Sequence, residues 1–92
     1  MPNPVCETGS YSNKSASALI YTGAGQLLGV FCASSTSGTV KFWDNTSAAA
    51  PIIVNTTSVA GGTWYPMPFS FTTGLYLTIT GTADVTVCYL PG

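Results

Sequence analysis

The sequence consists of short runs of β-branched, aliphatic and aromatic residues, each followed by a turn signal of glycine, proline, asparagine or serine. In the clearest run, residues 74–80, alternation places Leu75, Leu77 and Ile79 on one face. No segment has the spacing of an amphipathic helix, and turns recur about every 8 to 12 residues, as in β-sandwiches. We therefore predict an all-β fold: a single compact antiparallel β-sandwich, jelly-roll-like, with about seven or eight short strands. The expected strands cover residues 17–22, 26–34, 39–44, 51–55, 63–71, 74–80 and 85–90.

The N-terminal part of the chain has a different character. Residues 1–16 contain two prolines, several serines and asparagines, and almost no apolar periodicity. Such a composition is typical of an extended segment rather than a packed element. A chain of 92 residues is also too short for a second hydrophobic core. The predicted organisation is an N-terminal arm, residues 1–16, that becomes ordered on a partner, followed by one β-sandwich domain, residues 17–92.

Charged side chains make up only 5% of the sequence, whereas about 25% is usual in soluble proteins. A surface with so little charge is expected to be covered by other protein chains, which indicates a subunit of an assembly. Two basic residues are too few for nucleic acid, which takes roughly 6 to 10 phosphate contacts. No apolar run reaches the roughly 18 residues of a membrane span. Neither nucleic acid nor membrane is expected as a partner, and we find no secretory signal pattern.

The residues available for catalysis are few. The chain has no histidine, which excludes an imidazole base and the common mixed zinc site. The carboxylates of Asp44 and Asp84 remain candidates for acid–base work, which needs two carboxyl groups about 5 to 10 Å apart. Each lies in a turn, where aspartate typically bonds to nearby backbone, and this interpretation is favoured. A calcium site built on them would need about six to eight oxygen ligands, and too few acidic residues lie near either aspartate in the sequence. We therefore predict no enzyme activity, metal, cofactor or small-molecule substrate.

Three cysteines cannot all pair within one chain, so at least one is a thiol or is linked to another chain. Alternation places Cys88 away from the core and Cys32 on the core face, together with Leu28 and Val30. Cys32 is therefore predicted to be a small core residue. Cys6 lies in the predicted arm, and an interchain disulfide through Cys6 or Cys88 is one possibility. The alternative is three reduced thiols in a reducing compartment.

The aromatic residues allow several interpretations. Val40 and Phe42 share one face of a predicted strand, which leaves Lys41 and Trp43 on the other. Trp43 is then an interface residue, a core residue or part of a ligand platform, and the interface is favoured on a surface with so little charge. The residues expected at a subunit interface are Cys6, Tyr11, Trp43, Trp64, Tyr65, Phe69 and Tyr76.

Two prolines mark a place where a partner can sit. Pro66 and Pro68 lack backbone donors and lie two positions apart. A strand with this pattern belongs at the edge of a sheet or crosses between sheets, so residues 64–71 are expected there.

The order of motifs from Gln26 to Tyr89 resembles that of the small β-sandwich proteins that decorate and cement the capsids of tailed bacteriophages. The resemblance covers about two thirds of the chain, and its individual pieces are short. The motifs are Leu27-Leu28-Gly29-Val30, Gly38-Thr39-Val40-Lys41-Phe42-Trp43-Asp44-Asn45, Pro51-Ile52-Ile53, Phe71-Thr72-Thr73-Gly74-Leu75-Tyr76 and Asp84-Val85-Thr86-Val87-Cys88-Tyr89.

The resemblance implies a structural virion protein without catalysis. Such a protein binds as a homotrimer to the major capsid protein on the outer surface of the capsid and stabilises the expanded head. It is made in the cytoplasm of the bacterial host, and the predicted interface residues then contact other subunits or the capsid. The alternative is a carbohydrate- or receptor-binding module of a phage head fibre or tail, in which exposed tryptophans stack on a sugar.

Overall fold

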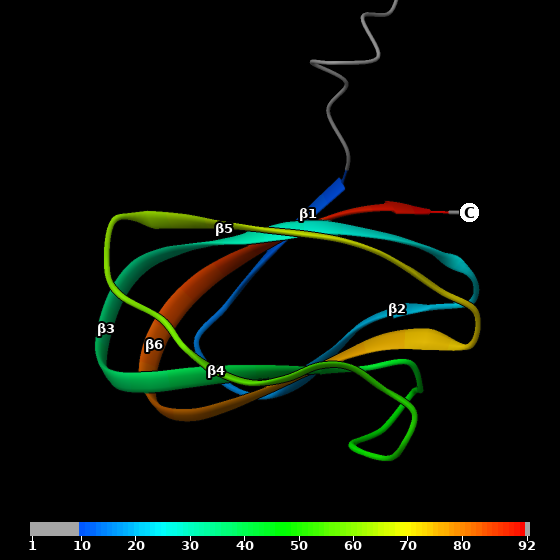
Figure 1. Cartoon of the computed structure of the whole chain (residues 1–92), viewed down its shortest axis with the longest axis horizontal. Helices are drawn as coiled ribbons and strands as arrows, with labels where there is room; N and C mark the ends of the chain where they lie inside the picture. Colours follow the sequence, from blue (N-terminus) through cyan, green and yellow to red (C-terminus); the bar gives the residue numbers. More distant parts are fainter. Residues whose placement is uncertain (1–9, 92) are drawn as a thin grey trace, which may run out of the picture.

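The computed structural model describes residues 10–91, which form one antiparallel six-stranded sheet (Figure 1). No helix is present in this range. An all-β fold was predicted, and the structure confirms it. The strands are β1 (Ser10–Lys14), β2 (Ala18–Thr22), β3 (Gly25–Trp43), β4 (Ile52–Ser58), β5 (Thr63–Phe71) and β6 (Gly74–Pro91).

Two long strands run through the whole molecule. β3 has 19 residues and β6 has 18, and they pair from Gly25 opposite Pro91 to Trp43 opposite Tyr76. Both bend sharply near the middle, where their register shifts between Thr36 and Thr39. The bend folds the sheet back on itself, so that each long strand contributes one half to each of two layers (Figure 1).

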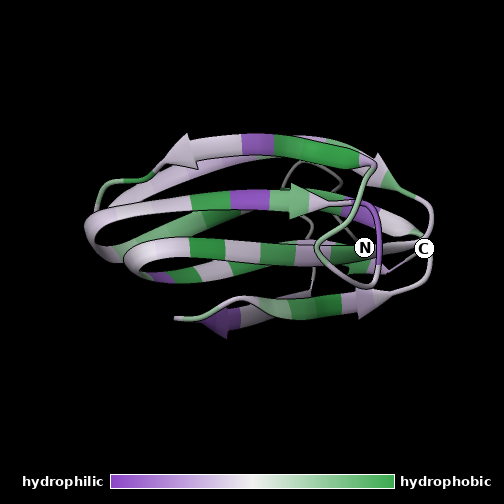
Figure 2. Ribbon diagram, turned by 90° about the horizontal axis from the view of Figure 1, so that it is seen from below, coloured by the Kyte–Doolittle hydropathy of each residue, from purple (hydrophilic) through white to green (hydrophobic). Residues whose placement is uncertain are grey.

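The short strands extend the two layers. We call layer A the part that contains β1, β5, the first half of β3 and the second half of β6. Layer B contains β2, β4, the second half of β3 and the first half of β6. Layer A is uppermost in Figure 1, and Figure 2 views the molecule from the layer B side, with hydrophobic and hydrophilic residues alternating along the strands.

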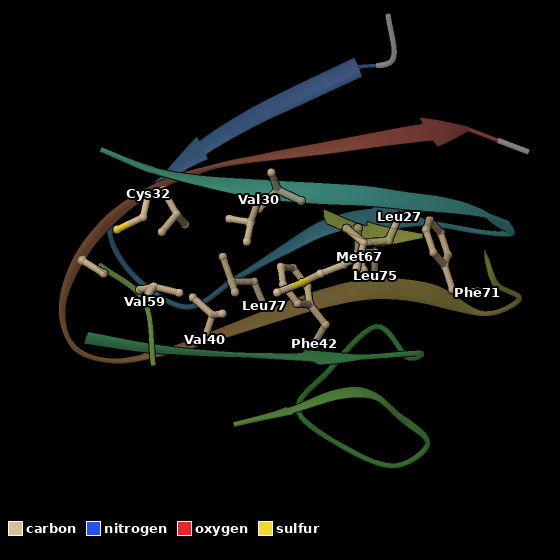
Figure 3. Close-up of a cluster of buried hydrophobic side chains, with 13 residues drawn as sticks. Leu27, Val30, Cys32, Val40, Phe42, Val59, Met67, Phe71, Leu75 and Leu77 are labelled. Atoms are coloured by element: carbon tan, nitrogen blue, oxygen red, sulfur yellow. The ribbon is translucent and has the colours of Figure 1, made fainter. Parts of the chain in front are cut away.

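The core lies between the layers (Figure 3). Alternation sends every second side chain of the long strands into it, and neither a charged nor a polar side chain of the described residues is buried there. Full burial of each large apolar side chain stabilises the fold by roughly 1.5–3 kcal/mol. The fully buried side chains include Phe42, Phe71, Leu27, Leu75, Leu77, Val30, Val40, Val85, Val87 and Cys32.

The number of strands differs from the prediction. Expected strands 26–34 and 39–44 are one strand, β3, and expected strands 74–80 and 85–90 are one strand, β6. Pairing continues into the intervening segments, where Ser35 pairs with Ala83 and Thr36 with Thr82, and resumes with a shifted register at Thr39 opposite Thr80. The structure therefore has six strands instead of seven or eight, and a sandwich of two separate sheets is not confirmed because one continuous sheet forms both layers.

The N-terminal boundary also differs from the expected one. Residues 10–14, the end of the predicted arm, form β1 and pair with β6, from Ser10 opposite Tyr89 to Lys14 opposite Val85. The sheet therefore starts before residue 17. The remainder of the arm, residues 1–9, lies outside the described residues.

A bulge reverses one predicted orientation. The register of β3 with both β5 and β6 shifts between Leu27 and Gly29. Because one extra residue flips the alternation, Leu27 is buried and Leu28 is only partly buried. The prediction that Leu28 shares the core face with Val30 and Cys32 is therefore wrong, although those two residues are buried as expected.

Candidate functional site

Four apolar and aromatic residues form a continuous row across the outer face of layer B. Leu19 of β2 lies opposite Tyr76, Tyr76 lies opposite Trp43, and Trp43 lies opposite Ile52 of β4. Leu19 is 41% exposed and Ile52 is 44% exposed, while the two aromatic residues between them are partly buried. We call these four residues the layer B row.

Trp43 is held in place by two contacts from its own face of the sheet. Its indole Nε1 donates a hydrogen bond to Oγ1 of Thr78 at 2.9 Å. The ammonium of Lys41 lies 4.3 Å from the centroid of the ring, a cation–π geometry. Val40 and Phe42 are fully buried on the opposite face, so the predicted outward orientation of Trp43 is confirmed. Trp43 is therefore part of the surface and not of the core.

A second group of aromatic residues lies on the outer face of layer A. Phe31 of β3 and Trp64 of β5 are register partners, 39% and 46% exposed. The Trp64 ring covers Gly29, because a side-chain carbon at Gly29 would lie 2.7 Å from its Cζ2 and Cη2 atoms. Tyr11 of β1 lies opposite Cys88 and is 76% exposed. We call Tyr11, Phe31 and Trp64 the layer A patch.

Of the predicted interface residues that the structure describes, two belong to neither group. Tyr65 packs against the core cluster, and its hydroxyl accepts a hydrogen bond from the backbone N–H of Ala60 at 2.8 Å. Phe69 of β5 is 47% exposed and lies opposite Leu27 of β3.

β5 pairs only with β3 in the part of the chain that is described. The expected edge position of residues 64–71 is confirmed.

The sequence did not single out Leu19, Phe31 or Ile52, although each belongs to one of the two surfaces. Their strands were predicted, except that β4 extends further than expected. Their exposure follows from the register between strands and from the bulges, and a single sequence does not specify which residues become cross-strand neighbours.

Cys32 and Cys88 are both unpaired, and Cys6, the other cysteine considered for an interchain disulfide, lies outside the described residues. Cys32 is buried, as predicted, and its thiol donates a hydrogen bond to the carbonyl of Ser34 at 3.3 Å. Burial raises the pKa of the Cys32 thiol, and burial also raises the pKa of the Cys88 thiol. Because the thiolate is the reactive form, this shift lowers the reactive fraction of each thiol at neutral pH. An interchain disulfide stays a prediction.

The two aspartates have separate hydrogen-bonding roles. The carboxylate of Asp44 accepts hydrogen bonds from the backbone N–H groups of Thr72, Thr73 and Gly74, the closest at 2.8 Å, and from the Thr72 hydroxyl. Desolvation alone would raise the pKa of Asp44, but these donors together outweigh it and hold the pKa below its usual range. Asp84 accepts a hydrogen bond from the side-chain amide of Asn13 at 2.8 Å. Each carboxylate therefore ties two segments of the sheet together.

Nothing in residues 10–91 resembles a metal centre, because no group of three or more potential ligands comes together there. No helix in the same range is long and apolar enough to cross a membrane.

An open depression lies where β3 begins and β5 and β6 end, and it contains no charged side chain. It is lined by Ala24, Gly25, Gln26, Ser70, Phe71, Leu90 and Pro91.

The fold and these surfaces define an all-β module with a partly exposed apolar group on each outer face. Comparison with known proteins found no matching family model, no similar curated protein and no similar solved structure.

Proposed function

We propose that this protein is a non-catalytic structural subunit that binds other proteins through the outer faces of its sheet. The observation that carries the proposal is the layer B row, in which Leu19, Tyr76, Trp43 and Ile52 are consecutive neighbours across four strands. On a solvated sheet face such positions are typically polar. A contiguous apolar row there is typical of a protein-binding surface.

The charge distribution supports binding to protein. The four side chains of the layer B row carry no formal charge, and the ammonium of Lys41 lies over the ring of Trp43. Apart from this ammonium, burying the row against a partner desolvates little charge. Aromatic residues are also enriched in the cores of protein interfaces, where charged residues are depleted.

The specific role we propose is that of a capsid decoration protein of a tailed bacteriophage. In this role a homotrimer binds the major capsid protein on the outer surface of the virion and stabilises the expanded head. The motif order from Gln26 to Tyr89 and the 5% charge content support it. In fold terms, we propose that the folded sheet is a variant of the jelly-roll-like sandwich in which β3 and β6 join the layers.

The proposal is tested by light scattering on the purified chain and by co-sedimentation with expanded capsids of the phage that encodes it. We expect a trimer that sediments with capsids. The double variant Leu19→Ser with Ile52→Ser removes the two most exposed residues of the row and should reduce capsid binding, while the control Thr22→Ser should not. Wild-type protein that stays in the supernatant at micromolar concentration would overturn the capsid role.

A second candidate function is favoured by the layer A patch. Phe31 and Trp64 are adjacent, partly exposed rings on one face, and sugars commonly stack on such rings. The protein would then be a carbohydrate- or receptor-binding module of a head fibre or tail. Quenching of tryptophan fluorescence by glycans, lost in Trp64→Ser and kept in Ile52→Ser, would support this function, and a blank glycan array for the wild type would contradict it.

A further inference from the structure

The sheet has four edge strands in the described part of the chain, and three of them carry features that hinder the addition of a further strand. β1, β2, β4 and β5 each pair with a single strand. On β5, Pro66 and Pro68 lack the backbone N–H groups that a new strand would need. Prolines at an edge are a common protection against unwanted pairing.

β2 and β4 are protected by irregular geometry. β2 has a bulge between Leu19 and Tyr21. On β4, the side chain of Asn55 accepts a hydrogen bond from the N–H of Thr56, and the hydroxyl of Thr57 donates to the carbonyl of Asn55. These local bonds occupy backbone groups of β4, and bulges twist an edge away from a straight partner.

β1 has none of these features. Its register with β6 is unbroken from Ser10 opposite Tyr89 to Lys14 opposite Val85, and it contains no proline. Asn13 fixes it to β6, because its side-chain amide donates to Asp84 Oδ1 at 2.8 Å and to the Val85 carbonyl at 3.1 Å. β1 is therefore a regular and firmly held edge.

We propose that β1 is a self-association edge on which β1 of a second copy of this chain pairs in antiparallel orientation. The register that pairs all five residues of both strands is centred on a twofold axis at Ser12. Ser12 then faces the partner's Ser12, and Tyr11 faces the partner's Asn13. The result is a continuous layer A that extends across two molecules.

The charges on β1 favour this occupant and this direction. Lys14 is the one charged residue of the strand, and in the antiparallel pair it lies opposite the partner's Ser10. A parallel pair in register would instead place the two lysines side by side, and like charges opposite one another destabilise a strand pair. A second copy of the chain can therefore pair with β1 in antiparallel orientation without placing like charges opposite one another.

The exposure of Tyr11 supports the same arrangement. Tyr11 is 76% exposed, more than any other exposed large hydrophobic residue in the described range. In the proposed pair the partner's Tyr11 is its diagonal neighbour, at a spacing that aromatic side chains span. The contact therefore covers the most exposed aromatic ring of each molecule.

This inference goes beyond the proposed function and does not depend on it. The twofold contact uses an edge of layer A, so the layer B row stays accessible for a capsid or for a threefold contact. If the wild-type chain binds capsids but does not pair through β1, only the edge contact is refuted. If it pairs through β1 but does not bind capsids, only the capsid role is refuted.

Disulfide trapping tests the register directly. In a Cys6→Ser, Cys88→Ser background, Ser12→Cys should form a covalent dimer with oxidised glutathione at least about tenfold faster than the control Ser70→Cys, because pairing raises the effective thiol concentration. Ser70 is exposed on β5, whose edge is blocked by prolines. Equal rates for the two variants would overturn the proposal.

Sedimentation velocity of the full chain tests it without cross-linking. Tyr11→Lys should weaken self-association about tenfold, because two cross-strand contacts are lost and the new lysines repel one another. The control Thr22→Lys places the same charge on the edge of β2 and should leave association unchanged. A wild-type chain that stays monomeric up to millimolar concentration, or an equal effect of both variants, would overturn the proposal.

Discussion

The indole of Trp43 donates a hydrogen bond to the hydroxyl of Thr78 across the β3–β6 pair, with Nε1 and Oγ1 2.9 Å apart. The bond fixes the ring on the outer face of layer B between Tyr76 and Ile52. A side chain that is already ordered loses less conformational entropy on binding, so this bond prepares the surface for a partner.

We expect Thr78→Val to destabilise the fold by about 0.5–1.5 kcal/mol, because valine keeps the shape of threonine but removes the acceptor. The emission of Trp43 should change as its indole loses the bond. Urea denaturation and tryptophan fluorescence measure the two effects. Thr80→Val, an exposed site on the same strand, is the matched control, and an equal loss there would show that the hydrogen bond contributes nothing.

Acidification should weaken the hydrogen bonds through which the Asp44 carboxylate holds the turn between β5 and β6. Hydrogen bonding lowers the pKa of Asp44 in the folded state, despite the opposing effect of desolvation. In the unfolded chain the carboxyl titrates near its reference value of about 3.9. The contribution of Asp44 to stability is therefore complete above that pH and is lost as the pH falls through the folded-state pKa.

Asp44→Asn should consequently lower stability at neutral pH and flatten the decline in stability on acidification. Urea midpoints measured from pH 7 to about pH 2 record both effects. If the variant loses stability with acid as steeply as the wild type, then Asp44 is not the group responsible.

The bend of the long strands should be sensitive to a single methyl group. Gly81 has φ +80°, and a side-chain carbon there would collide with the carbonyl of Ser37. Gly62 has φ +74° but open space around it, so an alanine at this position measures the cost of the backbone conformation without a steric clash. We expect Gly62→Ala to cost about 1–2 kcal/mol and Gly81→Ala more than about 3 kcal/mol. Thermal unfolding measures the difference, and equal costs would mean that the bend tolerates the added atom.

A leucine in the core and a leucine in the layer B row should respond very differently to truncation. Leu77 is fully buried opposite Phe42, whereas Leu19 is 41% exposed. Leu77→Ala should cost about 2–5 kcal/mol because it leaves a cavity. Leu19→Ala should change stability by less than about 0.5 kcal/mol. A large loss from Leu19→Ala in urea denaturation would indicate that the row belongs to the core.

The sequence predicted the all-β class of the fold and, for several strands, which residues share a face. Alternation grouped Val40 with Phe42, and Leu75 with Leu77 and Ile79; the first four are buried, and Ile79 is partly buried. It also placed Trp43 on the outer face. These predictions succeeded because alternation is a local property of a strand and does not depend on which strands are neighbours.

The continuity of the long strands could not be predicted, because the polar segments 35–38 and 81–84 have the composition of turns. In the structure these segments bend while the two strands remain paired, and Ser37 has φ +54° at the bend. β1 was missed for another reason. Its sequence, Ser-Tyr-Ser-Asn-Lys, has little apolar alternation, and its pairing with β6 relies on backbone bonds and on Asn13.

The candidate surfaces were predicted only in part. Trp43, Tyr76, Trp64 and Tyr11 were expected at an interface, and the structure places all four on outer faces. The row itself depends on the register of four strands and on the bulges in β2 and β3. Register is set by the packing of the whole sheet, which a single sequence does not specify.

The passage of β3 and β6 through both layers has a mechanical consequence. In two separate sheets, the layers are joined by side-chain contacts and by loops. Here a pull on a molecule attached to one face reaches the opposite face along two covalent backbones that are paired with each other over most of their length. The layers cannot slide past one another unless that pairing breaks, so the molecule is suited to transmit tension through its thickness without being sheared apart.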